Sequence, residues 1–189
     1  MTQQGKNAID LVLAESLIEL SAKKPIDKIT IKEITDKAGV IRPTFYNHFQ
    51  DKYELIEWII KTELLEPIKP LLNAGMIFEA IVLMLNNISA NSFFYKKALK
   101  LEGAVTFNQI AMKCVYEMFM NIISEKSTGK KSKYRWLTPE VISTYYAQSL
   151  CFITEGWIAQ GMDDIEPKEM AEAYMYLITR SMDDILSEL

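Results

Sequence analysis

The chain has 189 residues, which is long enough to bury a substantial core as one large domain or two small ones. Hydrophobic residues make up 49% and charged residues 24%, while glycine (7) and proline (6) are scarce, and this balance favours a globular helical protein over a turn-rich β fold. No apolar run reaches the length of about 18 residues that a membrane span needs, and the N-terminus lacks a signal-peptide core, so we expect a cytoplasmic protein with no membrane partner.

The net charge of −4 at first argues against a nucleic-acid partner, but the charge is unevenly distributed. Residues 1–52 carry 8 Lys and Arg against 7 Asp and Glu, whereas residues 53–189 carry 13 against 18. The acidity therefore belongs to the C-terminal part. A near-neutral N-terminal part still binds DNA if its cations cluster on one face, and a dimer doubles them.

Residues 7–23 are predicted to form an amphipathic helix, with Leu13 and Leu17 on its apolar face. Lys23 and Lys24 suit the negative end of its dipole, and Pro25 prevents its continuation. We interpret this helix as support for the two helices that follow. A membrane-binding role is the weaker alternative, because the charges on its polar face are mixed in sign.

Residues 30–53 are predicted to form two short helices joined by a tight turn. Thr30 followed by Glu33 is a capping-box pattern for a helix start, and Gly39 supplies the left-handed residue that ends this helix. The chain then restarts at Arg42 and Pro43, and proline is well placed in a first helical turn. Helix, glycine turn and helix together are the pattern of a helix-turn-helix, whose second helix enters the major groove of DNA.

Helices are predicted throughout the remainder, over residues 53–65, 76–90, 93–99, 104–125, 138–160 and 167–188. Between them, residues 124–135 are polar and rich in lysine, and we favour a solvated connector there over a second nucleic-acid contact. The expected fold is all-α, with an N-terminal three-helix helix-turn-helix head over residues 1–52. A C-terminal helical bundle over residues 53–189 would serve regulation and dimerisation.

The sequence lacks the residue patterns that enzymatic chemistry needs. It holds a single histidine, no His, Cys and Asp cluster at metal-binding spacing, and no glycine-rich phosphate loop, so we expect no catalytic residue, no metal and no cofactor. Cys114 and Cys151 are too few for a disulfide framework and are expected to be buried free thiols.

The run from Ala38 to Val40, the stretch Thr44-Phe45-Tyr46-Asn47-His48-Phe49 and the following Lys52 resemble the DNA-binding signature of the TetR family of transcriptional regulators. The resemblance covers roughly the first fifty residues. It implies a homodimer that binds an operator in double-stranded DNA. It also implies that the helix after the head changes its angle when the body is induced.

Seven residues are the candidate DNA contacts. Arg42 suits a bidentate pair with guanine, and Pro43 and Thr44 suit a thymine methyl group. The expected phosphate contacts are Lys32, Tyr46, His48 and Lys52. Two alternatives stay open: a lone histidine is normally structural, and Tyr46 could equally lie at the edge of the core. Phe45 and Phe49 are assigned to the core. Ile41 stands where family members often have Ser or Thr, so the helix start rests on Arg42 and Pro43.

The candidate ligand-pocket residues in the body are Tyr116, Phe119, Tyr145 and Phe152, although such residues are more often plain core. The long C-terminal helices carry more apolar surface than one body covers, so we expect them to pair with those of a second subunit. The strings from Ile41 to Gln50 and from Phe94 to Lys97 resemble TetR-type regulators of dihydroxyacetone-kinase operons. That group implies activation through a protein co-regulator, as an alternative to a repressor controlled by a small apolar or amphipathic effector.

Overall fold

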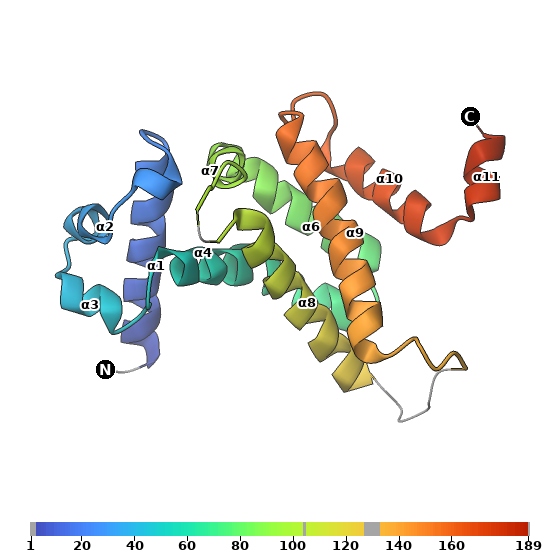
Figure 1. Ribbon diagram of the computed structural model, residues 1–189, viewed down its shortest axis with the longest axis horizontal. Coiled ribbons are helices and arrows are strands. Elements are labelled where there is room, and N and C mark those ends of the chain that lie inside the picture. The colour runs from blue at the N-terminus through green and yellow to red at the C-terminus, as the bar shows by residue number, and fades with distance from the viewer. Residues whose placement is uncertain (1–2, 104, 127–132, 189) are drawn as a thin grey trace.

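The computed structural model describes residues 3–103, 105–126 and 133–188, and every regular element among them is a helix. The predicted all-α fold is therefore confirmed. Figure 1 shows the helices of the N-terminal third at one end of the molecule and the C-terminal helices at the other. The α-helices are α1 (Gln3–Ser21), α2 (Ile31–Ala38), α3 (Arg42–Tyr46), α4 (Lys52–Ile59), α5 (Lys69–Asn73), α6 (Ile77–Ala90), α7 (Ser92–Ala98), α8 (Phe107–Lys126), α9 (Pro139–Ala159), α10 (Pro167–Thr179) and α11 (Met182–Ser187).

The first three helices pack as a compact head, with α2 lying against both α1 and α3 (Figure 1). Their shared core consists of Leu13 and Leu17 from α1, Ile34 from α2, and Phe45 and Phe49 from α3 and the turn after it, all of them buried. The assignment of both phenylalanines to the core is confirmed. Because the two rings fill the space beneath α3, the polar side chains of that helix are left on its outer face.

Helix α4 leads from the head into the body and contacts both α1 and α8 (Figure 1). It was expected to continue regularly to residue 65, but it changes at Ile60 into a π-helical segment, η2 (Ile60–Leu65). The Glu66 amide donates to the Lys61 carbonyl at 2.8 Å, five residues back instead of four. Beyond it the chain starts the short helix α5, with Pro70 in its first turn, which the sequence analysis missed.

The body is built from α6 to α10, with α8 against α9 and α10 against α6. No single described helix is long and apolar enough to cross a membrane, while α6 and α7 meet length and composition criteria only as a pair bent by 87°. Cys114 and Cys151 are both free and buried, as predicted, and burial raises the pKa of each thiol to about 12. Residues 127–132 of the predicted connector lie outside the described residues.

The prediction of one helix over residues 167–188 is wrong, because the chain breaks between α10 and α11. Arg180 is extended (φ −107°, ψ 152°), and the next residue, Ser181, begins a new helix. The Ser181 hydroxyl accepts from the Asp184 amide at 3.2 Å, and the Asp184 carboxylate accepts from the Ser181 amide at 3.2 Å. This capping box stabilises the break. The break was not predicted because the apolar residues keep a helical spacing across it.

Candidate nucleic-acid interface and ligand cavities

The turn between α2 and α3 is fixed at both ends by local hydrogen bonds. Thr30 and Glu33 form the predicted capping box, with the Thr30 amide donating to the Glu33 carboxylate at 2.9 Å. At the other end Gly39 adopts φ +68°, in the left-handed region that favours glycine, and the Val40 amide donates to the Thr35 carbonyl at 3.0 Å. These contacts determine where α3 begins and which way it points.

The start of α3 lacks the side-chain cap that serine or threonine would provide. Ile41 occupies the capping position without a side-chain hydrogen bond, and Pro43 stands in the first turn. The Thr44 amide nevertheless donates to the Ile41 carbonyl at 2.9 Å, so the turn is closed. The Ile41 side chain is 69% exposed beside the predicted contacts. Ile41 is not among the seven predicted contacts, although an apolar residue at a capping position was a signal in the sequence.

The outward edge of α3 carries three of the seven predicted contacts. Arg42, Pro43 and Tyr46 are exposed, and Thr44 is half-buried beside them. The Arg42 guanidinium donates to the Tyr46 hydroxyl at 3.3 Å and lies 5.9 Å from the centre of its ring. Tyr46 is 49% exposed, with its ring edge-to-face against Phe45 at 5.7 Å. Its hydroxyl is therefore available at the surface, while one side of its ring rests on the core.

His48 does not lie on this edge, which corrects its prediction as a phosphate contact. Its side chain is only 2% exposed, and its Nδ1 lies 2.6 Å from Oδ1 of Asp10, a buried carboxylate on α1. The pair ties the end of the reading helix to the supporting helix. His48 therefore has the structural role that was left open as the alternative to DNA contact. The sequence did not reveal Asp10 as its partner, because Asp10 lies 38 residues away in the chain.

Lys52 is also engaged inside the head. Its ammonium donates to the carbonyls of Ile26, Asp27 and Ile29 at 3.0, 2.7 and 3.2 Å. Burial lowers the pKa of Lys52. We therefore correct its predicted role from phosphate binding to support of the turn between α1 and α2. Lys32 keeps an exposed ammonium, paired with Asp36 at 2.6 Å, and its phosphate contact stays a prediction.

Replacing Lys52 with methionine should lower the melting temperature, because three carbonyls lose a charged donor while the apolar stem is retained. Hydrogen bonds to a charged group contribute about 1–3 kcal/mol, which corresponds to about 2–12 °C for a chain of this size. Thermal unfolding followed by circular dichroism measures this, with Lys69→Met, at an exposed lysine of α5, as the matched control. A phosphate contact would instead reduce the salt dependence of DNA binding by about one unit of slope.

Three lysines of the head, in addition to Lys32, are paired with its own carboxylates. Lys24 pairs with Glu33 at 2.5 Å, Lys28 with Asp27 at 3.2 Å, and Lys37 with Glu19. The hydrogen bond from Lys24, together with those from Thr30, lowers the pKa of Glu33 to about 2. Arg42 differs from these lysines because its recorded partner is the neutral Tyr46. A ligand at the edge of α3 therefore does not compete with a carboxylate among the described residues for the Arg42 guanidinium.

Ion pairs also attach α4 to the body. Glu57 on α4 accepts from Lys61 at 2.7 Å and from Lys113 on α8 at 2.8 Å, and Lys61 reaches Glu117 on α8 at 2.7 Å. Burial opposes the charged form of Lys61, but the hydrogen bonds to Glu117 and Glu57 outweigh it and raise the pKa of Lys61. The segment that leads out of the head therefore moves together with α8.

Two cavities lie between the helices of the body, besides wider pockets at the surface of α9 that Tyr145 and Phe152 line. The larger, of about 380 Å³, lies between α5, α6, α8, α9 and α10, and reaches solvent beside the exposed Ile77. None of the described residues that line it carries a charge, and its polar groups include the hydroxyls of Tyr146, Tyr174 and Thr179. Its size and apolar walls are those of a small-molecule pocket.

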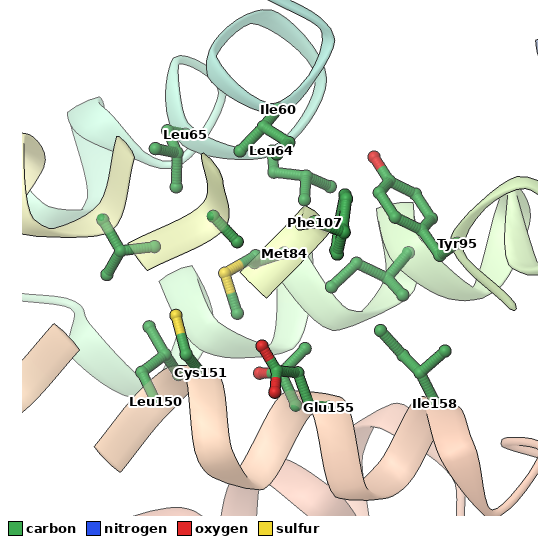
Figure 2. Close-up of a pocket in the computed structure, with 14 residues that line it drawn as sticks. Ile60, Leu64, Leu65, Met84, Tyr95, Phe107, Leu150, Cys151, Glu155 and Ile158 are labelled. Atoms are coloured by element: carbon green, nitrogen blue, oxygen red, sulfur yellow. The ribbon is translucent and has the colours of Figure 1, made fainter. Parts of the chain in front are cut away.

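The smaller cavity, of about 40 Å³, is bounded by η2, α6, α7, α8 and α9 (Figure 2). Its lining includes Leu64 and Leu65 of η2, Met84 of α6 and Cys151 of α9, all of them buried. Tyr95 on α7 closes one side. Its hydroxyl meets no partner in hydrogen-bonding geometry among the described residues, although burial and the nearby Glu63 charge raise its pKa well above the usual value.

Only one of the four predicted pocket residues lines either cavity. Phe119 of α8 lines the larger one. Tyr145 and Phe152 are 60% and 77% exposed on α9 and line wider pockets at its surface, so their contact with a ligand stays a prediction. Tyr116 is half-buried against the core and lines neither cavity. Tyr146 and Leu150, also on α9, do line the larger cavity. They lie on a different face of α9 from Tyr145 and Phe152.

A short helix held by a capped glycine turn on a three-helix support, with an arginine at its exposed start, defines a helix-turn-helix DNA-binding protein. Two family descriptions match the chain: "Bacterial regulatory proteins, tetR family" over residues 15–59, and "Transcriptional regulator C-terminal region" over residues 76–180. The chain belongs to the TetR family, and it is a DNA-binding transcriptional regulator, not an enzyme.

Relatives of known structure and sequence agree with this assignment. The chain is 26% identical over 152 residues, 79% of each chain, to the HTH-type dhaKLM operon transcriptional activator DhaS of Lactococcus lactis subsp. lactis (strain IL1403). A solved structure of the dihydroxyacetone kinase operon activator DhaS has a TM-score of 0.63 at 21% identity, covering 90% of this chain and 93% of that one. NalD of Pseudomonas aeruginosa, a repressor of the MexAB-OprM efflux pump, gives 0.59 at 12% identity, covering 92% and 96%. The similarity to dihydroxyacetone-kinase operon regulators is confirmed.

Proposed function

We propose that this protein binds a bacterial operator in the cytoplasm as a homodimer, with α3 of each subunit in the major groove. The observation that carries the proposal is the exposed edge of α3, where Arg42 keeps its charge and Pro43 lies beside it. Arg42 would pair with guanine, and Thr44 and the exposed Ile41 would meet thymine methyl groups. Tyr46 and Lys32 would bind flanking phosphates.

The proposed head comprises residues 1–52, and the proposed regulatory and dimerisation body comprises residues 53–189. Exposed apolar side chains on the C-terminal helices support pairing with a second copy. They are Tyr145, Phe152, Leu177, Met182 and Leu186. Exposed apolar side chains gathered in an interface would be buried on pairing, and a two-fold interface presents the same surface from both subunits.

The larger cavity is the proposed effector site. A largely apolar ligand without charge suits its walls, because burying an unpaired charge there would be costly. Binding of such a ligand would change DNA affinity through α4, which joins the head to α8 by the ion pairs of Glu57 and Lys61.

Selection of binding sites from a random duplex library tests the operator and dimer parts together. A homodimer should return an inverted repeat with half-sites spaced by about 10–10.5 base pairs or a multiple of this. Sedimentation of the protein on the selected duplex should give two chains per site. Recovery of single half-sites with one chain bound would contradict the proposed dimer.

A second candidate is a transcriptional activator whose body docks a protein co-regulator. The observation that favours it is the similarity to the L. lactis relative, which is an operon activator. Deleting the gene and measuring transcripts of neighbouring genes separates the two candidates. Transcripts that rise on deletion indicate a repressor, and transcripts that fall indicate an activator.

A further inference from the structure

The two cavities of the body share a wall made by two side chains, Met84 of α6 and Leu150 of α9. Both residues are buried, with exposed fractions of 3% and 5%. A shared wall means that the large cavity, which reaches solvent, and the small one adjoin at these two side chains. A ligand in the large cavity can therefore change the shape of the small one by displacing a side chain, without a prior movement of a helix backbone.

Met84 is the movable member of this wall. Methionine is unbranched, with three rotatable bonds, and adapts its shape to irregular spaces more readily than leucine does. Figure 2 shows its thioether among the side chains that surround the small cavity, close to Cys151. A cavity of about 40 Å³ has room on the order of three water-sized groups. That is enough to take up the sulfur and methyl of a rotated Met84.

The opposite wall of the small cavity is the π-helical segment. Ile60, Leu64 and Leu65 of η2 line it, and this segment continues directly from α4. A π-helical turn is an irregularity that is rare in proteins and frequent at functional sites. A side chain pushed into the small cavity would therefore press on the least regular part of the connection to the head.

We propose that Met84 relays occupancy of the large cavity to the DNA-binding head. An uncharged apolar ligand in the large cavity displaces the Met84 thioether into the small one, where it presses on Leu64 and Leu65 and shifts η2 and α4. This inference rests on the proposed effector site. It adds the residue, Met84, and the space that receives its side chain, the small cavity, through which that site acts. Two discrete positions of one packed side chain supply the two-state element that coupling between distant sites requires.

The test fills the receiving space. Ala111 of α8 lines the small cavity but not the large one, so Ala111→Leu places three carbons where Met84 would go. The matched control is Ala90→Leu, the same change at an exposed position of α6. The probe is N-phenyl-1-naphthylamine, an uncharged, apolar fluorophore, and its affinity is measured by fluorescence titration. DNA affinity is measured with and without the probe on the duplex recovered by selection.

In the wild type the probe should change DNA affinity by about 5-fold or more, the usual size of coupling between sites. In Ala111→Leu the probe should bind within about twofold of wild type, but its effect on DNA affinity should disappear. Ala90→Leu should behave as wild type. Because Ala111→Leu adds volume to a packed region, Ala111→Val is carried alongside, with folding checked by circular dichroism.

Full coupling in a folded Ala111→Leu or Ala111→Val variant would overturn the relay and leave the effector site standing. A wild-type protein that binds the probe without any change in DNA affinity would overturn ligand control, and the relay with it. The two failures are therefore distinct results of one experiment.

Discussion

Replacing Arg42 and Thr44 together with alanine should abolish sequence-specific binding to the operator and leave the fold intact. Arg42 is exposed at the start of α3, and its hydrogen bond to Tyr46 is a surface contact. One arginine–guanine pair contributes about 1–3 kcal/mol of discrimination. Two half-sites double this, so we expect affinity for the operator to fall at least about 30-fold. Fluorescence anisotropy with the operator and a scrambled duplex, at one fixed salt concentration, measures the loss.

The matched control removes an exposed cation from the body: Lys168→Ala on α10. It should leave operator affinity within about twofold of wild type, since exposed charges away from the interface contribute little. If the double variant still prefers the operator over the scrambled duplex, then α3 is not the reading helix.

Removing the carboxylate of Asp10 should destabilise the head more than any surface change. In Asp10→Ala the ring of His48, 2% exposed, loses the partner that now lies 2.6 Å from its Nδ1. Leaving one member of a buried hydrogen-bonded pair without its partner costs about 1–3 kcal/mol. For a chain of this length that corresponds to a melting temperature lower by about 2–12 °C. Thermal unfolding by circular dichroism gives the value directly.

Glu15→Ala, at an exposed position of the same helix, is the control and should leave the melting temperature nearly unchanged. A double-mutant cycle of Asp10→Ala with His48→Ala then isolates the pair from the packing of each residue. If the two losses simply add, Asp10 and His48 act independently and the proposed link between α1 and α3 does not exist.

The parts of the head that could be predicted from the sequence depend on local chemistry. Thr30 and Glu33 cap a helix three residues apart, and Gly39 ends it with a conformation that other residues rarely adopt. The core positions of Phe45 and Phe49 follow from helical spacing. Arg42 and Tyr46, one helical turn apart on α3, are exposed, and their exposure depends on how α3 packs on the head.

The roles of His48 and Lys52 could not be predicted in the same way. Each depends on a partner more than twenty residues away in the chain, and tertiary packing brings the partner close. The same holds for Tyr145 and Phe152, whose helix phase relative to α8 decides that they face outward. Aromatic composition alone cannot separate a pocket from an outer face.

The π-helical segment did leave a signal in the sequence. The buried residues Ile59 and Leu64 are five apart, as are Ile60 and Leu65. In a regular α-helix, residues five apart point about 140° away from each other, so both pairs cannot face one core. A π turn, with its hydrogen bond spanning five residues, brings each pair to the same side.

The self-neutralised cations of the head have a consequence for how this regulator finds its target in a genome. Attraction to DNA of any sequence grows with the number of cations that displace counterions from phosphates, and three lysines of the head outside the proposed interface, Lys24, Lys28 and Lys37, are already held by its own carboxylates. Random sites, which outnumber the operator by about 10⁶ or more, should therefore retain few molecules. A small number of copies per cell should suffice to keep the operator occupied.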